Sequence, residues 1–167
     1  MKLEHIFEAE LLLELGDAPY PWKWVKDPTD GVGKSGEAEF TVDGNKFEVQ
    51  LYHRSTDEDP NEDQTTIFWT KDGALKGDAE AGESQIRTMF TIADICKTYV
   101  AAIKPKYIKF EANKNPSSRG GRNRLASMYT RMVKRFATKM GYSITIDDGY
   151  ETGFVLTRRD KKRRMGR

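Results

Sequence analysis

The stretch GEAEFTVDGNKFEVQLYH, residues 36–53, decides the fold of this chain. Apolar and polar residues alternate in it twice, first at Ala38, Phe40 and Val42 and then at Phe47, Val49 and Leu51. Asp43-Gly44 lies between the two runs. Alternation on both sides of a two-residue Asp-Gly step is typical of a β-hairpin with one buried face. The sequence therefore predicts antiparallel strands at the centre of the fold.

Further strands are expected on both sides of this hairpin. Trp22 and Trp24 mark a first strand, and the apolar run TTIFWT at residues 65–70 predicts a third antiparallel strand. The acidic segment DEDPNED at residues 57–63 is interpreted as a solvated connection. Before these strands, apolar residues at helical spacing between residues 3 and 15 predict a short amphipathic helix.

The second half of the chain predicts two long helices. One begins near Ser84 and ends at Lys104-Pro105; the other begins near Asn123 and ends at Gly141. A strand at residues 107–112 separates them, and residues 142–146 and 153–157 form a closing hairpin. The expected fold is one α/β (α+β) domain over residues 1–158. It has a mixed, mostly antiparallel sheet, two long helices and the short N-terminal helix, followed by a basic tail at 159–167.

The composition narrows the classes to which the protein can belong. Its 167 residues are 37% hydrophobic and 32% charged, which is typical of a globular chain. The one cysteine, Cys96, excludes an intramolecular disulfide and is expected to be a buried apolar group on the first long helix. No run is long and apolar enough for a membrane span, so a cytoplasmic protein without a membrane partner is expected.

The net charge of +2 is the sum of an acidic first half and a basic second half. Residues 1–96 hold 9 Lys/Arg and 21 Asp/Glu, a net charge of −12, whereas residues 97–167 hold 19 and 5, a net charge of +14. Such a division has three interpretations: the halves neutralise each other in the fold, the basic half binds a polyanion such as nucleic acid, or it binds a protein with an acidic surface.

The basic residues of the second half form the candidate site. They lie in the loop before the second long helix, on its polar face, and at the C-terminus. The candidates for binding nucleic acid or phosphate are Arg119, Arg122, Arg124, Arg131, Lys134, Arg135, Lys139, Arg158, Arg159, Lys161, Lys162, Arg163 and Arg164. Lys and Arg that neutralise phosphates release counterions, so the expected binding is salt-dependent and largely independent of base sequence.

The residue spacings do not support a phosphate-binding loop or a metal site. The segment DGVGKS at residues 30–35 ends like a phosphate-binding loop, but Pro28 replaces the first glycine and a strand follows instead of a helix. His5, His53 and Cys96 do not lie at metal-ligand spacing, so no metal site and no cofactor are expected.

The order of strands and helices resembles the GNAT acetyltransferase fold. In that family the strand before the first long helix leads into a loop that binds the pyrophosphate of acetyl-CoA. Here the corresponding segment is GALKGDAEAGESQIRT, residues 73–88. It departs from the family pattern, because Gly77 and Gly82 lie far apart and Glu80 and Glu83 would repel a pyrophosphate.

A second sequence motif of the family is partly matched here, by Asn123, Ala126, Met128-Tyr129 and Gly141-Tyr142. The resemblance implies that Tyr129 is the general acid that protonates the departing thiolate. Tyr129 lies farther from Gly141 than the family pattern requires. If the chain is an enzyme, the resemblance implies an acetyl-CoA-dependent N-acetyltransferase.

Three segments, at residues 40–51, 90–112 and 127–143, are similar to short bacteriophage-encoded proteins of undefined role. This resemblance implies an accessory or virion-associated protein inside a bacterial host cell. Three hypotheses follow: a nucleic-acid-binding accessory protein, an N-acetyltransferase, and a charge-driven binder or inhibitor of a viral or host protein.

Overall fold

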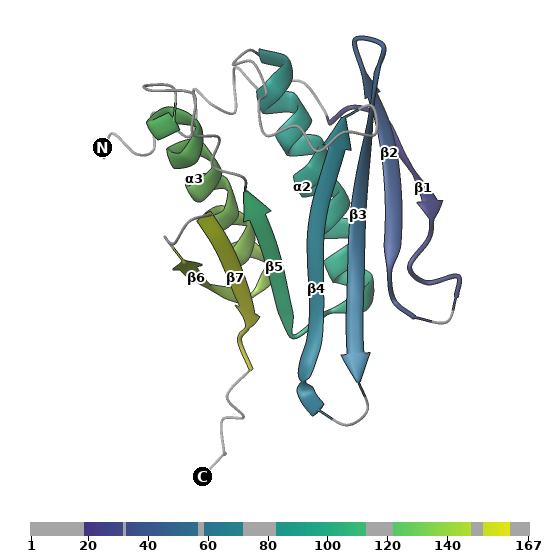
Figure 1. Ribbon diagram of the computed structural model, residues 1–167, viewed down its shortest axis with the longest axis vertical. Coiled ribbons are helices and arrows are strands. Elements are labelled where there is room, and N and C mark those ends of the chain that lie inside the picture. The colour runs from purple at the N-terminus through teal and green to yellow at the C-terminus, as the bar shows by residue number, and fades with distance from the viewer. Residues whose placement is uncertain are drawn as a thin grey trace.

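A computed structural model describes residues 19–31, 33–56, 59–71, 83–112, 122–147 and 152–160. They form a mixed α+β structure with one seven-stranded sheet and two helices (Figure 1). The strands are β1 (Trp22–Lys26), β2 (Gly36–Val42), β3 (Asn45–Thr56), β4 (Asp59–Lys71), β5 (Tyr107–Ala112), β6 (Tyr142–Asp147) and β7 (Thr152–Arg158). The helices are α2 (Glu83–Ile103) and α3 (Arg122–Met140). The expected mostly antiparallel sheet with two long helices is confirmed.

The hairpin at the centre of the prediction is formed by β2 and β3. Val42 pairs with Asn45, so Asp43 and Gly44 make a two-residue connection. Both have positive φ, 49° at Asp43 and 80° at Gly44, as a type I′ turn requires. Asp tolerates this conformation and Gly adopts it without a steric penalty, which explains why Asp-Gly sets the register here.

The next connection differs from the expectation. β4 begins at Asp59, and the β3–β4 ladder continues to the pair Thr56 and Asp59 beyond a register shift near Arg54. The interpretation of residues 57–63 as a solvated connection is therefore wrong from residue 59 onward. The pairs of Thr56 with Asp59 and of Arg54 with Gln64 hold both ends of this segment in the ladder despite its poor strand propensity.

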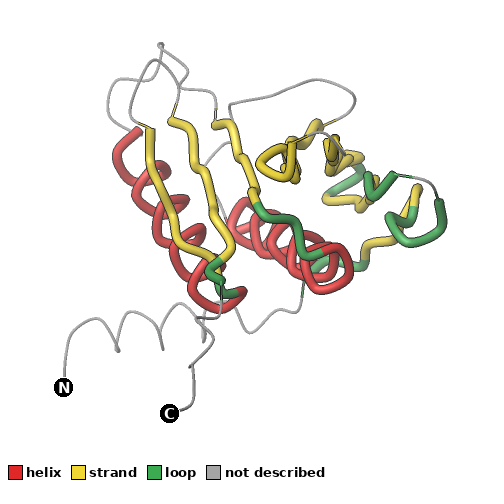
Figure 2. Tube along the Cα trace, turned by 90° about the horizontal axis from the view of Figure 1, so that it is seen from below, coloured by secondary structure: helices red, strands yellow, loops and turns green. Residues whose placement is uncertain are grey.

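The sheet order is β1-β2-β3-β4-β5-β7-β6, and β4–β5 is its parallel pair. A parallel pair needs a long crossover, and α2 supplies it. Figure 2 shows α2 and α3 on the same face of the sheet, and both helices line one apolar cavity against it. Neither described helix covers the opposite face of the sheet.

The core lies between this helix-bearing face and the two helices. Ile67, Ile108 and Leu156 are fully buried strand residues, and Ile95 and Tyr99 of α2 are fully buried against them. Cys96 is buried in the same cluster, which confirms its expected role as a small apolar group. Complete burial of such side chains supplies the main driving force for folding.

The helices end where the sequence predicts. α2 ends at Ile103, followed by Lys104 with φ of 52° and then Pro105. α3 ends at Met140, and Gly141, with φ of 80°, forms its left-handed C-terminal cap. The predicted N-terminal helix at residues 3–15 and the tail beyond Asp160 lie outside the described residues.

Candidate nucleic-acid interface

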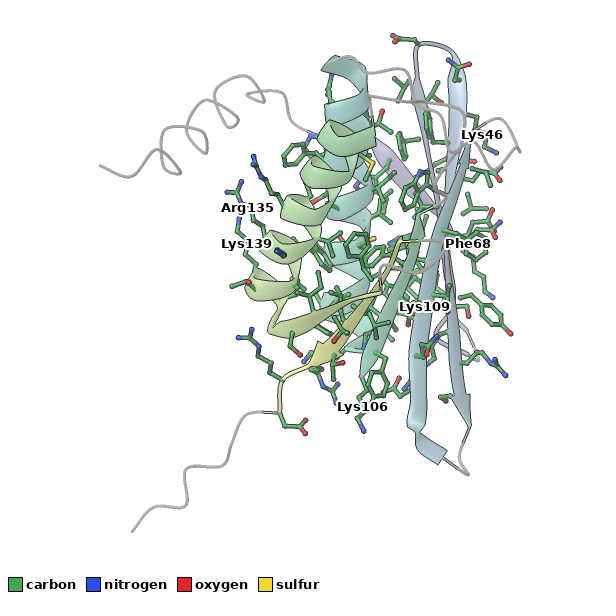
Figure 3. The ribbon with its side chains drawn as sticks, turned by 60° about the vertical axis from the view of Figure 1, so that its left-hand side comes forward. Lys46, Phe68, Lys106, Lys109, Arg135 and Lys139 are labelled. Carbon is green, nitrogen blue, oxygen red and sulfur yellow. The ribbon has the colours of Figure 1, made fainter. Side chains whose placement is uncertain are left out.

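Helix α3 separates its apolar and basic residues onto opposite sides. Met132, Val133 and Phe136 pack on the core, and Ala137 is buried in it. The side chains of Arg131, Lys134 and Lys139 are exposed. Figure 3 shows Arg135 and Lys139 on the side of α3 that faces away from the sheet. The amphipathic period of the sequence therefore gives α3 a basic outer face, as predicted.

The C-terminal end of α3 adjoins the end of β7. The amide of Arg159 donates a hydrogen bond of 2.9 Å to the carbonyl of Gly141, and Tyr142 pairs with Arg158 in the β6–β7 ladder. The side chains of Arg158 and Arg159 are exposed. Cations that are about 20 positions apart in sequence thus lie on adjoining segments.

The connection from α2 to β5 reaches the same place. The amide of Arg158 donates a 2.9 Å hydrogen bond to the carbonyl of Lys106, and its guanidinium donates to the carbonyl of Lys104. Lys104 is exposed and Lys106 is partly exposed. We call the cations of these three segments the basic edge: Lys104, Lys106, Lys139, Arg158 and Arg159. The sequence prediction missed Lys104 and Lys106, because nothing local indicates that they adjoin the end of β7.

Two acids of the first half, Glu39 and Glu48, pair with lysines of the same part of the sheet. On β1–β3, Glu39 pairs with Lys23 at 3.0 Å and with Lys46 at 2.8 Å, and Lys46 also reaches Glu48 at 3.0 Å. Hydrogen bonds from Lys46 and Lys23 hold the pKa of Glu39 below its usual value. Among the described residues, no ion pair joins an acid of the first half to Arg131, Lys134, Lys139, Arg158 or Arg159.

For several predicted site residues the structure does not describe the side chain. Arg122, Arg124 and Tyr129 belong to the backbone of α3, but their side chains lie outside the described part of the structure. Arg119 and the tail cations Lys161, Lys162, Arg163 and Arg164 also lie outside it. The roles assigned to these residues therefore stay predictions.

Strands β4 and β5 pair in parallel over a short stretch and then separate. The pairing runs from Gln64 opposite Tyr107 to Ile67 opposite Phe110, although β4 continues to Lys71. Behind this separation lies a cavity of about 40 Å³ between the sheet and both helices. Its walls are apolar and include Trp69, Cys96 and Phe110. Burial raises the pKa of the Cys96 thiol to about 12, so this group is a neutral thiol.

A buried polar chain lies toward the other end of β4, and the sequence prediction missed it. His53 Nδ1 and Tyr99 Oη both contact Thr65 Oγ1, at 2.9 Å and 3.0 Å. The Tyr99 hydroxyl donates to the carbonyl of Lys34 at 2.7 Å, and the amide of His53 donates to Ser35 Oγ at 2.9 Å. This chain fastens the β1–β2 connection to the sheet and to α2. Its members come from four segments, so no sequence spacing could indicate it.

The imidazole of His53 is nearly closed off from water, with 3% of its side chain exposed. Burial lowers its pKa, and this outweighs the opposing attraction of Asp63; Lys34 lowers the pKa further. His53 Nε2 lies 3.3 Å from Asp63 Oδ1, but the two atoms are not in hydrogen-bonding geometry. The histidine is therefore neutral at pH 7, and we assign it a structural role.

The chain matches no family model, no curated protein and no solved structure. None of the described helices is long and apolar enough to cross a membrane. Within the described residues, no group of three His, Cys, Asp or Glu side chains is placed to hold a metal ion. A functional conclusion must therefore rest on the charge and shape of the described surfaces.

We predict that acid destabilises the fold through His53. Because the folded state depresses the pKa of His53, the unfolded chain takes up a proton first as the pH falls through about 6.5. The free energy of unfolding should therefore fall between about pH 7 and pH 5. Urea denaturation across this range measures it.

The control is the other histidine. In His53→Gln the free energy of unfolding should change much less over this pH range than in the parent chain, whereas His5→Gln should keep the parent's pH dependence. An unchanged pH dependence in His53→Gln would show that His53 does not carry the effect. Glu39 and Asp27, whose pKa values are also lowered, titrate below this range.

Proposed function

We propose that this chain is a phage-type accessory protein that binds nucleic acid through the basic edge and the outer face of α3. One observation carries the proposal. Segments that are far apart in sequence bring their cations to one edge of the molecule, while Glu39 and Glu48 of the first half pair with Lys23 and Lys46 instead.

The chemistry of this edge suits a phosphate backbone. Arg159 and Lys139 are exposed and can each release a counterion on binding a phosphate. Arg131 and Lys134 continue the positive surface along α3. The sequence after Asp160 adds Lys161, Lys162, Arg163 and Arg164. Such contacts position a nucleic acid without reading its bases, so the proposed affinity depends on salt more than on base sequence.

We predict that Lys139→Ser combined with Arg159→Ser weakens nucleic-acid binding several-fold at low salt. Each lost phosphate contact removes about one unit from the slope of log affinity against log salt, so the slope should fall in magnitude by about two. Fluorescence anisotropy with a labelled oligonucleotide, over a series of salt concentrations, measures both quantities.

The matched control removes the same charge from the opposite edge of the sheet. Lys23→Ser combined with Lys26→Ser acts on β1, at the far end of the strand order, and should leave the affinity and slope nearly unchanged. If both variants lose the same affinity for the oligonucleotide, net charge explains the effect and the basic edge does not. If the parent chain binds no nucleic acid at any salt concentration, the proposal is wrong, and an acidic protein becomes the better partner for this edge.

The separation of β4 from β5 favours a second candidate, an acyl-CoA-dependent acetyltransferase. This candidate draws on the resemblance of the sequence to the GNAT fold. From Phe68 onward, the edge of β4 that faces β5 has no ladder partner in β5. The amides of an extended pantetheine arm could pair with such a backbone edge. The proposed cofactor position is the start of α2 near Ser84.

Under this second candidate we expect acetyl-CoA to raise the thermal stability of the chain, because a ligand specific for the folded state must do so. Saturation at 100 times the Kd would add about 2.7 kcal/mol. Differential scanning fluorimetry measures the shift. Adenosine 3′,5′-bisphosphate is the control ligand, since it has phosphates but no pantetheine arm.

The double variant of Lys139 and Arg159 separates the two surfaces. An acetyl-CoA shift that persists in this variant, and that exceeds the shift with the bisphosphate, supports the acyl-CoA site. A shift that the bisphosphate reproduces, or that disappears with the basic edge, would assign the effect to phosphate binding and remove the acetyltransferase candidate.

A further inference from the structure

The face of the sheet opposite the helices carries aromatic side chains on its β3–β5 part. Residues alternate between faces, and Ile67, Leu51 and Ile108 point to the core, so their neighbours point outward. Tyr52 of β3 is 56% exposed, and Tyr107 of β5 is partly exposed. Phe68 of β4 is partly exposed on the same side (Figure 3).

The strand register places these rings on neighbouring rows. Tyr107 lies opposite Gln64, and Gln64 lies opposite Arg54. The next row holds Tyr52, Thr66 and Lys109, and the row after it holds Glu37, Gln50 and Phe68. With strands about 4.8 Å apart and rows about 7 Å apart on one face, neighbouring rings are roughly 10 Å from each other.

The charge around Tyr107 and Tyr52 is positive. We define the sheet-face patch as Tyr52, Arg54, Phe68, Tyr107 and Lys109. The Lys106 ammonium also lies 5.3 Å from the centre of the Tyr107 ring. The two rows that contain Tyr107 and Tyr52 extend over β7 and β6 as Thr157 and Ser143, and as Val155 and Thr145. All side chains of both rows are described, and none is a carboxylate.

The rest of this face carries charges of both signs. Glu39 and Glu48 of β2 and β3 lie there with their partners Lys23 and Lys46. An anion would therefore be attracted to the β3–β7 part and not to the β1–β2 part. Charge complementarity thus favours a negatively charged occupant for the sheet-face patch.

The sheet-face patch is continuous with the basic edge. Lys106 of the basic edge immediately precedes Tyr107, and Arg158 immediately follows Thr157, the ladder partner of Tyr107. A polymer whose phosphates contact the basic edge would therefore reach Tyr107 first and then Tyr52 and Phe68.

We propose that the sheet-face patch binds the bases of single-stranded nucleic acid, which stack on Tyr107, Tyr52 and Phe68 while the phosphates contact the basic edge. This inference rests on the proposed nucleic-acid binding and specifies its substrate. Exposed aromatic rings next to cations are the means by which sheets bind unpaired bases. A duplex keeps its bases stacked on each other and cannot offer their faces, so the patch selects single strands.

The test compares two probes with equal phosphate number: a labelled oligothymidylate of about 12 nucleotides, within the usual site size, and an abasic oligomer of the same length. The full chain should bind the oligothymidylate about tenfold more tightly or better at one salt concentration. Tyr52→Leu combined with Tyr107→Leu should remove most of this preference, with Phe68 keeping one stacking contact. The abasic affinity and the salt slope should not change.

Two further variants serve as controls. Tyr52→Phe combined with Tyr107→Phe keeps the rings and should retain the preference for bases, because stacking does not need the hydroxyl groups. If the double leucine variant does not fold, Tyr52→Leu alone should still reduce the preference, since this side chain is largely exposed.

The outcomes separate this inference from the proposed function. Equal binding of both probes by the parent chain overturns the inference but keeps nucleic-acid binding. A preference for bases that survives undiminished in the leucine variants also overturns it, because the bases would then be bound elsewhere. If neither probe binds, the proposed function fails and the inference fails with it.

Discussion

The parallel pairing of β4 with β5 is the constraint on which the rest of the structure depends. Strands that run in the same direction cannot be joined by a tight turn, so α2 must cross over one face of the sheet. α3 then packs beside α2 on that face and closes the core. The described structure therefore has a helix-bearing face and an opposite face that neither helix covers.

This arrangement also determines where charge gathers. Because α3 lies on the helix-bearing face, its apolar side must point inward and its cations outward. Its C-terminal end is brought against β7, and the α2–β5 connection meets the same place through the carbonyls of Lys104 and Lys106. Glu39 and Glu48 of the acidic half meanwhile pair with Lys23 and Lys46 on β1–β3. The charge division of the sequence thus becomes a division in space.

Local signals in the sequence predicted much of this fold. Asp43-Gly44 predicted the hairpin because a two-residue turn depends on its own residues, and the apolar period of α3 predicted its basic outer face. The strand over residues 59–63 could not be predicted, because it is anchored by the pairs of Asp59 and Gln64 with β3 and its own composition opposes it. The contact of Lys104 and Lys106 with the end of β7, and the row that joins Tyr107 to Arg54, depend on strand order. Such neighbours arise only when distant segments pair.

The central claim is that nucleic acid contacts the basic edge. Hydrogen exchange of the parent chain, measured by mass spectrometry with and without an oligonucleotide, tests it most directly because it locates the contact without any substitution. If nucleic acid contacts the basic edge, exchange should slow at residues 104–109, 139–143 and 157–160. It should not change at residues 37–48 on β2 and β3. Protection confined to residues 37–48, or binding without protection at the basic edge, would contradict it.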